Sequence, residues 1–163
     1  MTSWIVTSIL AFFLLCTSVS SSASITKLSS EAKEYMLQED TFSGISSVKE
    51  IPASVLMKFA EIAKDPNLKI ANPGEKFQVT DVISEAGLPS RRLIFGGISK
   101  DYCLIHYERG GRAHSYQVIL FKLSAKSADF LWGGTRFNRI RDLSELRELI
   151  RADALDDSRP YSW

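Results

Sequence analysis

The sequence predicts an α+β domain in which a four-stranded antiparallel meander packs against two N-terminal helices and one C-terminal helix. Two observations carry this prediction. Four β-rich runs follow one another between residues 92 and 132, joined by short connections. Stretches with amphipathic helical spacing lie before and after these runs. An antiparallel sheet flanked by helices in this way buries a face under them.

The two N-terminal helices are predicted from capping residues and from the spacing of apolar side chains. Ser29 or Ser30 can cap a short helix over residues 31–38. Pro52 suits a first helical turn, because its missing N–H is not needed there. In residues 53–64 the apolar side chains fall on one stripe, which is the pattern of a helix with one buried side.

The segments around these helices are predicted from shorter signals. Residues 43–49 have the composition of a loop. Apolar and polar residues alternate over 76–80, which makes a fifth strand possible there. The C-terminal helix begins at Asp142, where Asp142 and Glu145 have the spacing of a capping box.

The four runs of the meander each lead to a turn-like connection, and three of these connections contain a glycine doublet. We interpret the doublets as turns and strand ends, with an anion-binding nest of backbone N–H groups as the alternative. The runs are 92–95, 102–108, 114–123 and 129–132, and the doublets are Gly96-Gly97, Gly110-Gly111 and Gly133-Gly134.

The N-terminus has the pattern of a secretory signal peptide. No charged side chain occurs before Lys27, and an apolar run is followed by small residues that suit cleavage after Ala23. We therefore expect a signal peptide over 1–23, a single domain over 24–155 and a polar tail over 156–163. The protein is then secreted or periplasmic, with no stable membrane anchor after cleavage.

Charge is distributed unevenly along a chain whose formal net charge is only +1. Residues 91–141 carry ten basic and three acidic side chains, whereas the segments on both sides are acidic. A basic segment can attract an anionic partner. The near-zero net charge favours a different interpretation, in which acidic helices neutralise the basic strands within one molecule. Because the chain is predicted to be exported, we expect no nucleic acid partner.

Both histidines lie in the hairpin around Gly110-Gly111, so its register decides whether they meet. A two-residue turn places Tyr107 opposite His114 and puts the two histidines on opposite faces. A three-residue loop instead places His106 opposite His114, which would allow a metal site. We expect the two-residue turn, because it sorts mostly apolar from more polar residues between the two faces.

The hairpin is also the best place to look for catalysis. Two histidines with a carboxylate could bind a metal, and a cysteine with a histidine could form a nucleophile pair. The expected register separates these groups, and the sequence contains no established catalytic, metal or phosphate-loop motif. We therefore expect no cofactor and no metal, with Cys103 as a buried small apolar residue. The candidate residues of this alternative are Cys103, His106, Glu108 and His114.

These observations favour an exported, non-catalytic binding or accessory protein. An unidentified protein or an anionic ligand would dock on the polar face of the sheet, around Arg91, Arg92, His106, Glu108, Arg109 and Arg112. One alternative is a small metal-dependent or thiol hydrolase built on the hairpin. Another is a pocket for an apolar ligand under Phe59, Ile105, Tyr116 and Trp132, with Trp132 as a possible stacking platform.

Overall fold

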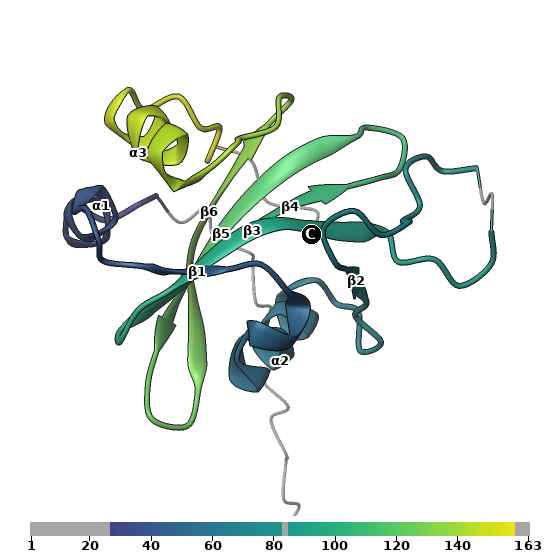
Figure 1. Ribbon diagram of the computed structural model, residues 1–163, viewed down its shortest axis with the longest axis horizontal. Coiled ribbons are helices and arrows are strands. Elements are labelled where there is room, and N and C mark those ends of the chain that lie inside the picture. The colour runs from purple at the N-terminus through teal and green to yellow at the C-terminus, as the bar shows by residue number, and fades with distance from the viewer. Residues whose placement is uncertain (1–26, 83–84, 159–163) are drawn as a thin grey trace, which may run out of the picture.

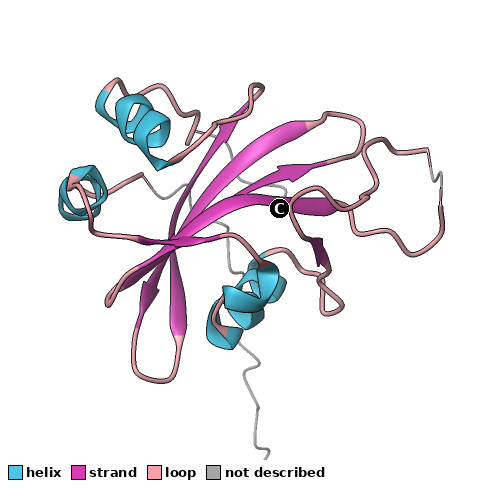
Figure 2. Cartoon of the chain, in the orientation of Figure 1, coloured by secondary structure: helices cyan, strands magenta, loops and turns pink. Residues whose placement is uncertain are grey.

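The computed structural model describes residues 27–82 and 85–158, which form a six-stranded sheet between two layers of helix (Figures 1 and 2). Helix α2 lies on one side of the sheet, and helices α1 and α3 lie on the other (Figure 1). In chain order the elements are α1 Ser30–Leu37, β1 Ser43–Ile45, a 3-10 helix Val48–Glu50, α2 Ala53–Ile62, β2 Ile70–Ala71, β3 Arg91–Ile98, β4 Tyr102–Arg109, β5 Ser115–Leu123, β6 Ala128–Arg136 and α3 Leu143–Arg151.

The predicted α+β class is confirmed, with three helices and a mostly antiparallel sheet. Strands β3, β4, β5 and β6 form the predicted meander, and each pairs with the next in antiparallel orientation. The sheet order is β1-β3-β4-β5-β6, with β2 added beside β3 in the one parallel pairing. The meander therefore forms the body of the sheet and positions both candidate histidines.

Helices α1 and α3 begin at the predicted capping residues, whereas Pro52, expected in a first helical turn, directly precedes α2. Ser29 accepts a hydrogen bond from the backbone N–H of Ala32 at the start of α1. Asp142 accepts one from the N–H of Glu145 at the start of α3, and Glu145 in turn accepts from the N–H of Arg141. In a capping box the Glu145 carboxylate would accept from the backbone N–H of the cap residue Asp142, but here it accepts from that of Arg141, the residue before the cap.

The predicted fifth strand at 76–80 is wrong, because these residues form no strand. The additional strands are β1 and β2, which are three and two residues long. Strand β1 falls in residues 43–49, the segment predicted as a loop. Alternation over two or three residues is too short to be recognised in a sequence, so these strands are defined by their pairing with β3.

Two of the three glycine doublets are not turns. Gly96-Gly97 lies inside β3 and Gly133-Gly134 lies inside β6, which makes both strands longer than predicted. A Cβ atom on Gly97 would lie 2.9 Å from the Cβ of Phe42, so the close approach of another segment requires glycine here. Only Gly110-Gly111 lies in a connection, between β4 and β5.

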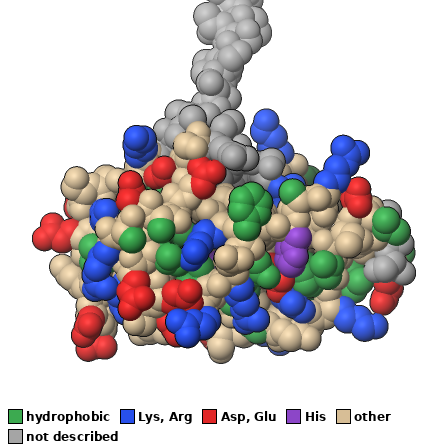
Figure 3. All heavy atoms as spheres, turned by 90° about the horizontal axis from the view of Figure 1, so that it is seen from above, with side chains coloured by type: hydrophobic (Ala, Val, Ile, Leu, Met, Phe, Trp, Pro, Cys, Tyr) green, Lys and Arg blue, Asp and Glu red, His purple; other side chains and the backbone are tan. Residues whose placement is uncertain are grey.

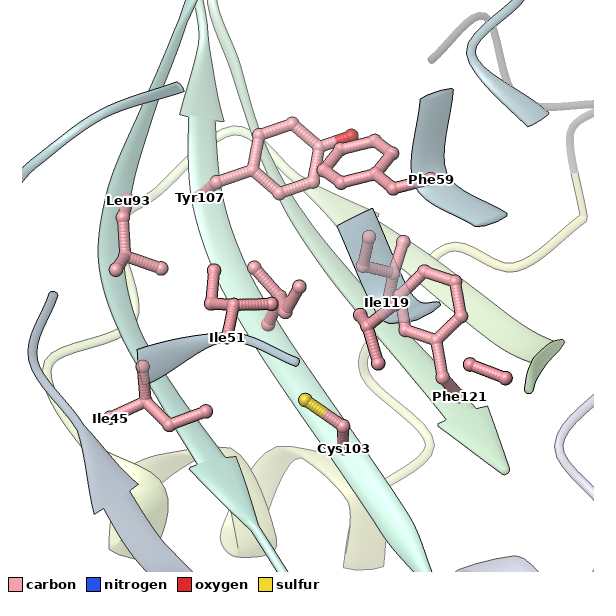
Figure 4. Packing of buried hydrophobic residues seen from close by; sticks show 11 residues of the cluster. Ile45, Ile51, Phe59, Leu93, Cys103, Tyr107, Ile119 and Phe121 are labelled. Atoms are coloured by element: carbon pink, nitrogen blue, oxygen red, sulfur yellow. The ribbon is translucent and has the colours of Figure 1, made fainter. Parts of the chain in front are cut away.

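Both faces of the sheet are buried. On the face under α2 (the α2 face), Phe59 packs with Tyr107 and Phe121 (Figure 4). Ile105 belongs to the same cluster. On the opposite face (the α1/α3 face), Met36 of α1 and Leu146 of α3 pack over a second apolar cluster from the strands. A sheet covered by helices on one face only has polar side chains on its other, exposed face. Here helices cover both faces, and the central strands carry apolar side chains on both sides.

The predicted signal peptide, residues 1–23, lies outside the described residues. Of the predicted polar tail, Asp156 pairs with Thr135 of β6 through two backbone hydrogen bonds, and Asp157 accepts a hydrogen bond from Trp132. Within residues 27–82 and 85–158, none of the helices has the length and apolar content needed to cross a membrane.

Candidate functional site

The register of the β4–β5 hairpin differs from both registers considered for the sequence. Arg109 pairs with Ser115 and Tyr107 pairs with Gln117, so residues 110–114 form a five-residue loop. The expected two-residue turn is wrong because its argument assumed one polar and one apolar face. Both faces are buried, so the sorting of apolar residues does not distinguish the registers.

This register divides the six predicted docking residues between the two faces. Arg91 and Arg109 are paired on the α2 face, beside the pair Leu93 and Tyr107. Successive residues of a strand point to opposite faces. The next pair along, Arg92 with Glu108, therefore faces the other side of the sheet, as His106 does, and Arg112 lies in the hairpin loop. The six residues do not form a single surface.

Arg91 and Glu108 are buried and paired rather than exposed for docking. The Arg91 guanidinium lies 3.1 Å from a carboxylate oxygen of Asp65 and 5.8 Å from the centre of the Phe59 ring. Burial, together with the nearby charge of Arg91, lowers the pKa of Arg109. These contacts make Arg91 part of the packing between the sheet and the segment that follows α2.

Glu108 joins the sheet to the hairpin loop through two partners. Its Oε1 lies 2.6 Å from Nε of Arg92, and its Oε2 lies 3.1 Å from Nε2 of His114. Only 7% of the Glu108 side chain is exposed, whereas that of His114 is 36% exposed. The Arg92 guanidinium also stacks 4.4 Å above the Phe77 ring. A buried carboxylate with both oxygens paired is a structural connection.

His106 is a structural histidine whose two ring nitrogens are both occupied. Nδ1 donates to the carbonyl oxygen of Gln117 at 2.9 Å, and Nε2 accepts from the N–H of Ile140 at 3.3 Å. This pairing requires the neutral Nδ1–H tautomer. Burial lowers the pKa of His106 to about 4. Neither nitrogen is available to bind a metal or to accept a proton from a substrate.

The thiol alternative fails on geometry as well. Cys103 is fully buried in the cluster under α2 (Figure 4), whereas His106 lies on the opposite face. Burial raises the pKa of the Cys103 thiol to about 12, which keeps it protonated at neutral pH. The part of the chain that the structure describes contains no group of three metal-binding side chains. Cys103 is therefore a core residue, as predicted.

The residues that a pocket for an apolar ligand would need do not lie around one cavity. Phe59 and Ile105 belong to the core under α2, whereas Trp132 belongs to the core on the other face. Trp132 is 2% exposed and its indole N–H donates to Asp157. This tryptophan is not the exposed stacking platform considered for the sequence.

An open cleft of about 730 Å³ lies at the end of the sheet that carries the β4–β5 loop. At this end of the sheet Figure 2 shows loops and the short strand β2, which pairs with the start of β3. The residues that line this arginine cleft are Arg109, Gly110, Gly111, Arg112, Ala113, Ser115, Gln117, Thr135, Arg136, Phe137, Asn138, Ala154 and Asp156.

Among the described residues that line the arginine cleft, three are arginines and one is an aspartate, so basic side chains outnumber acidic ones. Arg112 has an ion pair with Asp81, but the distance is 3.7 Å and both side chains are largely exposed, which makes this pair weak. Asp156 uses a carboxylate oxygen to accept two hydrogen bonds from Ser158. Elsewhere, as seen from above in Figure 3, basic and acidic side chains are interleaved over the surface.

The polar side chains in the cleft form a directed chain of hydrogen bonds. The Thr135 hydroxyl donates to Oε1 of Gln117 at 2.7 Å, and Nε2 of Gln117 donates to the Ser115 hydroxyl oxygen at 3.0 Å. The chain therefore ends at Ser115, beside Arg109 in the neighbouring strand. Its hydroxyl proton has no paired acceptor among the described residues.

Arg109 and Arg112 of the predicted docking residues line this cleft, and the other four do not. Sequence reasoning missed Arg136, Phe137 and the polar residues on β5 and β6. One signal was available, because Arg136-Phe137 directly follows the last β-rich run and precedes the helix cap. Their position opposite the hairpin loop depends on strand pairing, which the sequence did not determine. No protein-family model, curated protein or solved structure matches this chain.

Proposed function

We propose that the chain is an exported, non-catalytic binding protein that holds a small anionic ligand in the arginine cleft. The observation that carries this proposal is that Arg109, Arg112 and Arg136 all line one open cleft at the end of the sheet. Its volume of about 730 Å³ lies in the range of small-molecule binding sites. Guanidinium groups recognise carboxylate, sulfate and phosphate groups through paired hydrogen bonds.

The chemistry of the hairpin supports binding rather than catalysis. The Cys103 thiol is buried and protonated, and both nitrogens of His106 are held by backbone groups. His114 is partly exposed, but its Nε2 is paired with Glu108. A hydrolase needs a nucleophile and a base within hydrogen-bond reach of each other, and these residues do not provide such a pair.

Isothermal titration calorimetry of the mature protein at low ionic strength tests the cleft, with sodium sulfate and inorganic pyrophosphate as probes. We expect both anions to bind, and Arg112→Gln/Arg136→Gln to weaken binding by about tenfold or more, because two charge-assisted contacts are lost. Arg151→Gln is the matched control, since Arg151 is exposed on α3 outside the cleft. Equal binding by the double variant and the wild type would refute the assignment.

Export rests on the uncharged, apolar N-terminus. We expect the chain purified from the exported fraction to begin at Ser24, after cleavage following Ala23, which its intact mass would establish. Native mass spectrometry of the same sample distinguishes a small anion from an acidic partner protein. A retained molecule of a few hundred daltons would support the proposed ligand, whereas a second protein chain would replace it with a protein partner.

A further inference from the structure

The arginine cleft carries an apolar group as well as charge. Phe137 lines the cleft and is 79% exposed, although a phenylalanine side chain favours burial. Scattered exposed apolar residues are common, but this ring stands at the rim of a site already lined by three arginines. A ligand in the cleft can therefore contact a guanidinium group and a phenyl ring together.

Strand pairing places the residues that line the arginine cleft. Arg109 pairs with Ser115, and the last pair between β5 and β6 is Tyr116 with Arg136. Phe137 follows Arg136 in the bend after β6 and lines the same cleft. Neighbouring strands are about 4.8 Å apart, so Arg109 and Ser115 lie side by side in the sheet, and Phe137 belongs to the lining beyond the end of β6.

The hydrogen-bond chain leaves a hydroxyl donor at Ser115 in the cleft. Because the Ser115 oxygen accepts from Gln117, its proton is left to donate toward a ligand oxygen. Arg109 lies beside Ser115 in the neighbouring strand, and Phe137 lines the same cleft. An anionic oxygen is favoured at the Ser115–Arg109 side, and an apolar group is favoured over the ring.

We infer that the ligand of the arginine cleft is an amphipathic anion. Its carboxylate, sulfate or phosphate group contacts Ser115 and the arginines, and an aromatic or alkyl group packs on Phe137. This inference rests on the proposed function and adds the ligand class to it. A fully polar anion of the same charge uses the arginines alone and leaves the phenyl ring in water.

The test compares 3-phenylpropionate with propionate by calorimetry on the mature protein, because these probes differ only in the phenyl group. We expect 3-phenylpropionate to bind about tenfold more tightly, the ratio expected when one face of a phenyl ring leaves water. Phe137→Ala is expected to remove this difference, because the two acids then meet the same arginines with no ring beside them. Since Phe137 is exposed, this variant retains the packing of the core.

Two further variants complete the test. Met57→Ala is the matched control, because Met57 is 73% exposed on α2 and does not line the cleft. Ser115→Ala is expected to weaken both acids by about threefold to tenfold, through the loss of one hydrogen bond to a charged group. Equal affinity of the two acids, or an unchanged ratio in Phe137→Ala, would overturn the inference while sulfate binding still supports the cleft. Failure of sulfate, pyrophosphate and both acids to bind would refute the proposed function itself.

Discussion

His106 should make the stability of this protein fall in mild acid. In the folded state burial lowers the pKa of His106 to about 4, whereas an unfolded histidine titrates near 6.5. Below pH 6.5 the unfolded chain binds a proton that the folded chain excludes. The contribution of His106 is therefore complete above pH 6.5 and is lost progressively as the pH falls to 4.

The size of this effect follows from the two pKa values. One pKa unit corresponds to about 1.4 kcal/mol, so His106 should remove about 3 kcal/mol of unfolding free energy between pH 6.5 and pH 4. Urea unfolding at a series of pH values measures the loss in the wild type and in His106→Gln. The variant removes the titrating group, so its unfolding free energy should fall less steeply over this range.

The second histidine, His114, supplies the control for this prediction. His114→Gln should keep the steep fall, because His106 remains in place. Nuclear magnetic resonance should also show the Nδ1–H tautomer of His106 at pH 7, as its two backbone partners require. A His106 ring that titrates near 6.5, or an equal loss of stability in wild type and His106→Gln, would refute the assignment of a buried neutral ring.

Three further predictions concern residues outside the arginine cleft or at its edge. The Cys103 thiol should resist a disulfide reagent at pH 8 in the folded protein and react in denaturant, because burial raises its pKa to about 12; labelling of the folded protein at the rate of a free peptide thiol would contradict this. Gly110→Ala should lower the unfolding free energy by at least about 2 kcal/mol, since its Cβ would lie 1.8 Å from a backbone oxygen, whereas Gly44→Ala meets nothing within 4 Å. Glu108→Gln should lower it by about 3 kcal/mol by breaking a buried ion pair, and the exposed Glu61→Gln by less than about 1 kcal/mol; similar losses in the two would show that Glu108 is not structurally paired.

The helices and the meander were predictable because their signals are local. The stripe of apolar residues in 53–64 and the capping pair Asp142 and Glu145 act within a few residues of chain, and the structure retains them as α2 and the start of α3. The order of the four long strands followed from short connections. Predictions of this kind do not require knowledge of what packs against each element.

The register and the extra strands were not predictable, because they depend on distant partners. Residues 102–105 are apolar on both sides of β4, so shifting the hairpin by one residue leaves a similarly apolar pattern on each face. Strand β1 forms because Gly96-Gly97 of β3 lets residues around Phe42 approach closely. Nothing in the sequence of either segment alone indicates that approach.

The error in register explains why only part of the lining of the arginine cleft was predicted. Arg109 and Arg112 flank the glycine doublet, so their place beside the loop follows from the sequence in any register. The opposite wall of the cleft, Arg136 and Phe137, reaches the loop only through the pairing of β5 with β6. Arg91 and Glu108 have the composition of a docking surface, but their partners Asp65 and His114 become evident only in three dimensions.

The same contacts that remove Glu108 from the docking surface determine how the arginine cleft can bind. The β4–β5 loop is fixed by backbone bonds from Gly110 to Ser90 and from Gly111 to Val79, and by the His114–Glu108 pair. Arg112 therefore projects from a loop whose backbone is held at both ends. Ordering a loop on binding weakens affinity, and a loop ordered in advance avoids that cost. The buried pairs of the hairpin would thus lower the cost of the ligand binding that we propose for the cleft.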